Sequence, residues 1–131
     1  MAIEFEVSDI LPAAPNQVYK AWLDSDGHTS MTGGAAKAST DLGGDFEAWD
    51  GYIHGRNLAL DPGRRIVQSW RTAEFDATEE DSQIEVVLEE VDGGTNVTLR
   101  HTNLPPHGTQ YQQGWNDHYF APMKEYFSGQ P

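Results

Sequence analysis

The clearest structural signal in the chain is the stretch SQIEVVLEEVDGGTNVTLRHTN, residues 82–103. Apolar residues and one histidine occupy alternate positions in its two halves: Ile84, Val86 and Leu88, then Val97, Leu99 and His101. Such alternation is typical of a strand with one buried face and one solvent-exposed face. Gly93 and Gly94 lie between the halves and readily supply the positive φ of a tight turn. We therefore predict an antiparallel hairpin here.

The chain before this hairpin shows the same pattern of strands and turns. Residues 3–7 alternate apolar and acidic side chains, and further strands are predicted near residues 36–40, 45–49, 53–60 and 65–71. Turn pairs occur between the β-rich segments: Gly33-Gly34, Gly43-Gly44, Asp50-Gly51 and Pro62-Gly63. Their spacing predicts a meander of antiparallel strands.

An early helix is predicted to begin at Pro15, which suits the first helical position. Val18, Trp22 and Leu23 then recur at helical spacing. We expect this helix to end within residues 24–27, with a short irregular or helical piece continuing to residue 31.

After the hairpin the period of the sequence changes, from about residue 108. Aromatic or apolar residues now recur three or four positions apart: Tyr111, Trp115, Tyr119, Met123 and Tyr126. This spacing predicts one long amphipathic C-terminal helix. Pro122 lies inside it and lacks a backbone N–H, so we expect a kink there.

Together these elements predict an α+β protein of one domain, residues 1–131, in which the last helix covers the apolar face of an antiparallel sheet. A strongly curved sheet wrapped around one helix tends to leave space between them. The rings on the helix also carry polar atoms, and each needs a hydrogen-bond partner, a water or a ligand.

Composition excludes several classes of protein. Asp and Glu number 21 and Lys and Arg 8, so the net charge is −13. A surface this acidic repels phosphate backbones and anionic lipid headgroups, so we expect neither nucleic-acid nor membrane binding. The chain has no cysteine, which excludes disulfides and thiolate sites. It has neither a signal peptide pattern nor a long apolar run, so we expect a soluble cytoplasmic protein, monomeric or homodimeric.

Several segments resemble the START-like (SRPBCC) superfamily, and within it the branch named after the activator of the heat shock protein 90 ATPase. They are GGDF at 43–46, DGYIHGRNL at 50–58, PGRRIVQSWR at 62–71, and the C-terminal GW, YF, PMK and YF at 114–115, 119–120, 122–124 and 126–127. The resemblance covers residues 3–127. The order and spacing of the segments carry it, rather than any single motif.

The resemblance implies a helix-grip fold, in which a curved antiparallel sheet wraps a long C-terminal helix over a cavity. Members of the superfamily bind lipids, sterols, hormones or polyketides, and a few are cyclases. The eukaryotic activator has two domains, and this chain is similar to the C-terminal one alone.

The expected cavity gives a set of candidate ligand-binding residues for a small, apolar or amphipathic molecule. They are Trp49, Trp70, His101, Trp115, Tyr119 and Tyr126. Two interpretations stay open for them, because an aromatic stripe on a covering helix also fills a core. His101 in particular either holds a ligand oxygen or acts as a general base, or is a hydrogen-bonded core histidine.

We predict no catalytic residue, no cofactor and no metal. The five histidines include no pair two or four positions apart, and the P-loop, Rossmann and Gly-x-Ser-x-Gly patterns are absent. The predicted function is therefore non-enzymatic ligand binding. One alternative is a protein-interaction module that assists a 90-kilodalton heat-shock chaperone. Another is a cyclase or hydrolase using His101, which requires an acid or nucleophile within hydrogen-bond reach.

Overall fold

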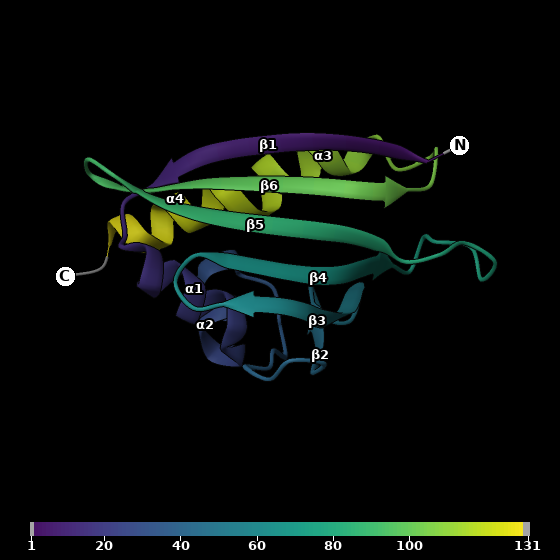
Figure 1. Ribbon diagram of the computed structural model, residues 1–131, viewed down its shortest axis with the longest axis horizontal. Helices are drawn as coiled ribbons and strands as arrows, with labels where there is room; N and C mark the ends of the chain where they lie inside the picture. The colour runs from purple at the N-terminus through teal and green to yellow at the C-terminus, as the bar shows by residue number, and fades with distance from the viewer. Residues whose placement is uncertain (1, 130–131) are drawn as a thin grey trace.

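A computed structural model describes residues 2–129 as a six-stranded antiparallel sheet with helices against one face (Figure 1). The strand order is β1-β6-β5-β4-β3-β2. The strands are β1 (Ile3–Leu11), β2 (Asp45–Ala48), β3 (Ile53–Asp61), β4 (Arg65–Thr72), β5 (Ser82–Val91) and β6 (Gly94–Leu104). The helical segments are α1 (Pro15–Leu23), α2 (Ser25–Thr32), α3 (Gln110–Trp115), η1 (Asn116–Phe120) and α4 (Ala121–Ser128). The predicted α+β helix-grip architecture is confirmed.

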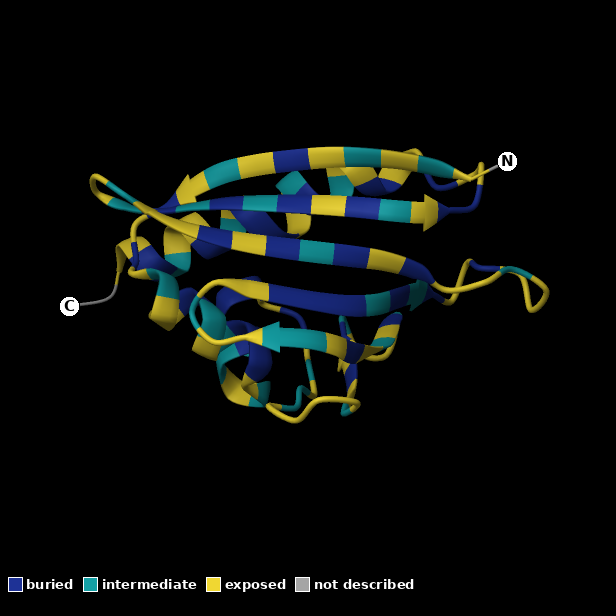
Figure 2. Cartoon of the chain, in the orientation of Figure 1, coloured by how far each residue is buried: buried dark blue, intermediate teal, exposed yellow. Residues whose placement is uncertain are grey.

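The hairpin predicted from residues 82–103 is the β5–β6 pair. Its register places the alternating residues opposite one another: Ile84 with His101, Val86 with Leu99, and Leu88 with Val97. All six side chains are buried on the face that the helices cover, and the residues between them are more exposed (Figure 2). Burial of this single face fixes the register, because a slip by one residue would move every apolar side chain to the solvent face.

The strand predicted at residues 36–40 is wrong. Only an isolated bridge between Lys37 and Glu47 occurs in this segment. Side chains from other elements explain the difference. The hydroxyls of Thr29 and Ser25 on α2 donate to the carbonyls of Ala36 and Ala38. The buried amide of Asn57 on β3 donates to the carbonyl of Ser39 at 2.9 Å. These carbonyls are therefore satisfied by side chains instead of by a neighbouring strand.

The break expected at Pro122 takes the form of a π-turn, η1, directly before α4. Ala121 N–H donates to the carbonyl of Asn116, five residues back, instead of to the carbonyl four residues back. A proline ring clashes with the carbonyl four residues before it, here that of His118, and a wider turn relieves this contact. The C-terminal helix is thus continuous from Gln110 to Ser128 but carries one extra residue in its middle turn.

This extra residue moves the buried stripe of the helix by one position. The buried side chains are Tyr111, Trp115, Tyr119, Phe120, Met123 and Phe127. Phe127 thus occupies the core position that regular helical spacing assigns to Tyr126, which is only partly buried. The prediction for the first half of the helix is confirmed, and the last position is corrected.

Gly55 on β3 provides a test of how tightly the sheet is packed. A Cβ at this position would overlap the carbonyl of Ser69 on β4 and lie 2.7 Å from the Phe46 ring. We expect Gly55→Ala to lower the free energy of unfolding by about 2–3 kcal/mol, as overpacking does. Chemical denaturation of the two proteins measures the difference.

Gly114→Ala is the matched control, because a Cβ at Gly114 meets nothing within 4 Å. Alanine is also the better helix former, so this variant should gain about 0.5–1 kcal/mol. A loss at Gly114 equal to that at Gly55 would contradict the packing described here.

Candidate functional site

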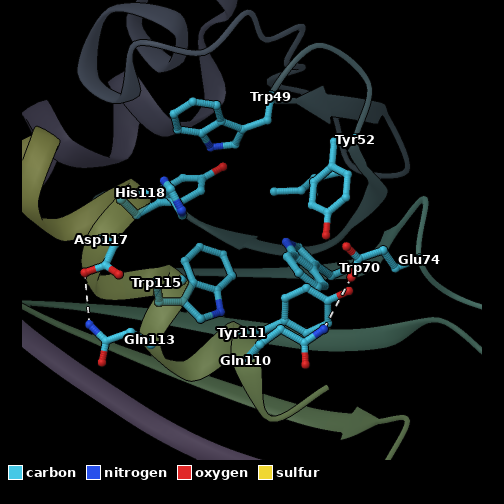
Figure 3. Close-up of a pocket in the computed structure, with 13 residues that line it drawn as sticks. Trp49, Tyr52, Trp70, Glu74, Gln110, Tyr111, Gln113, Trp115, Asp117 and His118 are labelled. Atoms are coloured by element: carbon cyan, nitrogen blue, oxygen red, sulfur yellow. Dashed lines mark hydrogen bonds between the residues drawn. The ribbon is translucent and has the colours of Figure 1, made fainter. Parts of the chain in front are cut away.

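A cavity of about 740 Å³ lies between the C-terminal helix and the β2–β3–β4 side of the sheet. This volume is within the range of about 300–1,000 Å³ typical of small-molecule sites. Most of its lining is aromatic: Trp49, Tyr52, Trp70, Tyr111, Trp115 and Tyr119. Figure 3 shows the labelled rings among these converging on a common space from the turn after β2, from β4 and from the helix. The cavity is therefore an opening between elements that are far apart in sequence.

The Trp49 indole is held over the cavity by a strained turn. Trp49, Asp50 and Gly51 have positive φ values of 52°, 61° and 87° in succession. A left-handed conformation costs non-glycine residues roughly 1–2 kcal/mol each. The turn is held by a hydrogen bond from Asp50 N–H to the Ala35 carbonyl at 2.9 Å, and Gly34 packs directly against the indole ring. Backbone strain that the surrounding structure holds in place is often found at ligand-binding and active sites.

Trp115 is fixed by a chain of buried hydrogen bonds behind the cavity wall. Its Nε1 donates to His101 Nδ1 at 3.0 Å, and His101 Nε2 lies 2.8 Å from Ser82 Oγ. Ser82 Oγ donates to the carbonyl of Trp70 at 2.6 Å, so His101 Nε2 carries the proton and donates to Ser82. His101 is therefore a neutral imidazole with both nitrogens occupied. Its burial lowers its pKa to about 3.

Two tyrosine hydroxyls of the wall are also satisfied by partners behind it. Tyr119 Oη lies 2.8 Å from His28 Nε2, and His28 Nδ1 donates to the Trp22 carbonyl at 2.8 Å, so the hydroxyl is the donor to His28. Burial lowers the pKa of His28 and raises that of Tyr119 far above its usual range, which keeps both groups neutral. Tyr111 Oη pairs with Thr72 Oγ1 at 2.6 Å.

Trp49 Nε1 differs from these groups. Within residues 2–129 it is the one buried side-chain nitrogen or oxygen without a hydrogen-bond partner. Figure 3 shows that its nitrogen-bearing edge faces the cavity. An unpaired buried N–H costs about 1–3 kcal/mol, and an acceptor on a bound molecule or a water would remove that cost.

The mouth of the cavity is polar and acidic. Glu74 and Asp117 contribute carboxylates from opposite sides, and both are exposed (Figure 3). Gln110 Nε2 donates to Glu74 Oε2 at 3.4 Å, and Gln113 Nε2 donates to Asp117 Oδ1 at 2.9 Å. These neutral amides orient the carboxylates without cancelling their charge. Among the described residues of the lining, none is Lys or Arg.

The structure brings together four of the six predicted ligand-binding residues. Trp49, Trp70, Trp115 and Tyr119 line the cavity. His101 is fully buried behind Trp115, and Tyr126 is displaced from the buried stripe by the π-turn, so neither is among the lining residues.

Several lining residues were not predicted. Tyr111 carried a sequence signal, since it begins the aromatic stripe of the last helix. Tyr52 had none, because it lies in the turn before β3, where no periodicity applies. Glu74 and Asp117 also have no sequence pattern that separates them from other exposed residues. Only the approach of the turn and loops to the helix identifies them.

The Ser82–His101 pair is not arranged for nucleophilic catalysis. A catalytic histidine accepts the proton of the nucleophile and is oriented by an acid on its other nitrogen. Here His101 donates to Ser82, and its other nitrogen accepts from an indole. Both residues are buried behind the wall and neither lines the cavity. A nucleophile is within reach of His101, as the hydrolase alternative requires, but the direction of the hydrogen bond is reversed.

Two further properties concern residues 2–129 as a whole. No three His, Asp or Glu side chains in this range gather closely enough to hold a metal ion. No helix in the same range has the length and apolarity needed to cross a lipid bilayer.

Residues 12–128 match the family described as "Activator of Hsp90 ATPase homolog 1-like protein". The chain belongs to this family. A curated relative from Dictyostelium discoideum, named "Activator of 90 kDa heat shock protein ATPase homolog", is 29% identical over 118 residues. That match covers 88% of this chain but only 30% of the relative's length.

Solved structures of other proteins resemble this fold. An HSP90 activator from Plasmodium falciparum has a TM-score of 0.86 at 20% identity, with 96% of each chain covered. CalU16 from Micromonospora echinospora has a TM-score of 0.79 at 23% identity, covering 98% of this chain and 78% of that one. At these identities the likeness concerns the fold.

The buried state of His101 predicts acid sensitivity. Its folded pKa of about 3 lies below the unfolded value of about 6.5, so the unfolded chain binds more protons between these pH values and the fold loses stability as pH falls. From pH 7 to pH 5 this loss is about 2 kcal/mol for one such group. His101→Gln keeps a donor and an acceptor without titrating, so we expect its loss over this range to be smaller by about that amount. Urea unfolding at both pH values measures it.

His107→Gln is the control, with the opposite sign. A hydrogen bond with Glu79, at 2.9 Å, raises the pKa of His107. The pair therefore stabilises the fold at low pH, and this stabilisation is lost as pH rises. Removing it should make the acid-induced loss larger. If His101→Gln left the loss between pH 7 and pH 5 unchanged, the neutral buried imidazole described here would be wrong.

Proposed function

We propose that this protein binds a small, largely apolar molecule in the cavity between the C-terminal helix and the sheet, without transforming it. The observation that carries the proposal is the cavity of about 740 Å³ itself, with its aromatic lining and one unpaired buried donor, Trp49 Nε1. Apolar walls with a few polar groups are the usual composition of ligand sites.

The lining is held in place before any ligand arrives. Tyr119, Tyr111 and Trp115 each use their polar atom in a hydrogen bond to a residue that is not part of the lining. Their rings are therefore fixed, with the ring surfaces available to a guest. Binding to fixed rings costs less side-chain entropy than binding to mobile ones, which favours affinity.

The absence of a reaction is part of the proposal. The two buried histidines near the wall, His28 and His101, have lowered pKa values, and each has both ring nitrogens engaged. Neither is available to accept a proton from a bound molecule.

Gly114 offers a direct test, because it lines the cavity and has open space where a side chain would begin. We expect Gly114→Leu to fill part of the cavity and abolish binding while the protein keeps its melting temperature. A ligand at about 100 times its Kd stabilises the wild-type fold by about 2.7 kcal/mol, or roughly 10 °C in Tm. A thermal-shift screen of lipids, aromatic acids and polyketide-like compounds measures both proteins.

Gly114→Ala is the control for the helix change alone and should keep most of the ligand shift. The proposal fails if no compound raises the wild-type melting temperature. It also fails if Gly114→Leu responds to a ligand as strongly as the wild type does.

A second candidate function is favoured by family membership. The Dictyostelium discoideum relative is named an activator of a 90 kDa heat shock protein ATPase. We infer that this chain contacts such a chaperone, although it corresponds to only 30% of that relative. The test is the ATP turnover of the purified chaperone from the same organism as a function of added protein.

The expected result for this second function is a saturable rise in turnover. Gly114→Leu separates the two functions, because its change is confined to the cavity: we expect this variant to lose the ligand shift and keep the rise in turnover. A rate that stays flat over a wide range of added protein, at low and at moderate salt, would exclude the chaperone role.

A further inference from the structure

The acidic side chains that line the cavity have no Lys or Arg beside them among the described lining residues, and the one imidazole of the lining is that of His118. Glu74 and Asp117 stand on opposite sides of the cavity mouth. The net charge of the whole chain, −13, adds to the same negative field. An anionic headgroup entering this mouth would face repulsion from both sides, whereas a cation would be attracted.

The aromatic lining has the same preference. The face of an indole or phenol ring carries partial negative charge and attracts a cation within about 6 Å of its centre, most strongly for tryptophan. Trp49, Trp70 and Trp115 all line the cavity. Trp70 and Trp115 have ring centroids 5.6 Å apart with planes at 41°, so their faces are inclined to one another instead of being stacked flat.

The positive side chain nearest to this region in sequence does not change the balance. Arg71 donates to Asp81 Oδ1 at 2.7 Å and to the carbonyls of Glu79 and Asp76 at 3.1 and 2.9 Å. Its guanidinium is thus used to hold the loop between β4 and β5, and Arg71 is not one of the lining residues.

From the acidic mouth and the tryptophan-rich lining, we propose that the ligand is an organic cation, an amine or quaternary ammonium group attached to an apolar body. The cationic group lies among the ring faces near Glu74 and Asp117, and the apolar body fills the rest of the cavity. This inference rests on the proposed function, which it narrows from apolar molecules in general to one chemical class.

Three probes that share a phenylbutyl chain and differ only in the end group test this inference. One ends in trimethylammonium, one in a hydroxyl and one in a carboxylate, and isothermal titration at about pH 8 measures the affinity of each. We expect the cation to bind about tenfold more tightly than the alcohol, and the carboxylate to bind most weakly. The alcohol reports the cavity alone, independently of charge.

The double variant Glu74→Gln with Asp117→Asn locates the effect. It should weaken the cationic probe about threefold to tenfold and leave the alcohol unchanged. The control is Glu89→Gln with Glu90→Gln, which changes the net charge equally at exposed positions of β5 outside the cavity. This control should leave the cationic probe within about twofold of the wild type.

Each other outcome is informative. If the alcohol binds but the carboxylate binds as well as the cation, the cation preference is wrong and the proposed function stands. If both double variants weaken the cation equally, the carboxylates at the mouth have no specific role and the inference fails. If none of the three probes binds, and the broader thermal-shift screen also finds nothing, the inference and the proposed function fail together.

Discussion

The hydrogen bond from Trp115 Nε1 to His101 Nδ1 joins the C-terminal helix to the sheet, and the cavity wall depends on it. A buried indole N–H without a partner is costly, and so is a buried imidazole nitrogen. One hydrogen bond satisfies both groups. The series of hydrogen bonds then continues from His101 through Ser82 to the Trp70 carbonyl. The same requirement pairs Tyr119 with His28 and Tyr111 with Thr72. Satisfying polar edges behind the wall leaves the ring surfaces to define a cavity.

The π-turn has a comparable role along the helix. Regular helical spacing places Tyr119 and Tyr126, seven residues apart, on one stripe. In the structure Tyr119 lines the cavity, whereas Phe120 and Phe127 are buried and Tyr126 is only partly buried. A backbone irregularity that a proline imposes therefore separates the part of the helix that lines the cavity from the part that seals the interior. π-turns are often found at functional sites for this kind of reason.

The chain belongs to the Activator of Hsp90 ATPase homolog 1-like family, and a curated relative is named an activator of a 90 kDa heat shock protein ATPase. The cavity adds a property that belongs to the chain's own residues. Its strained Trp49 turn, its unpaired indole donor and the carboxylates of Glu74 and Asp117 all border this cavity. The cavity lies on the helix side of the sheet, and the described helices leave the opposite face of the sheet uncovered (Figure 1).

The sequence by itself determined the α+β class, the β5–β6 hairpin and the aromatic first half of the last helix, because alternation and helical spacing are local patterns that burial of one face imposes. It also indicated Trp49, Trp70, Trp115 and Tyr119 as residues around the expected cavity. Tertiary structure alone decided that residues 36–40 leave the sheet, since the side chains that donate to their carbonyls come from α2 and β3. The tertiary structure likewise decided that His101 is neutral and donates a hydrogen bond to Ser82. It also decided that Tyr52, Glu74 and Asp117 line the cavity. These depend on contacts between distant segments, which no local periodicity records.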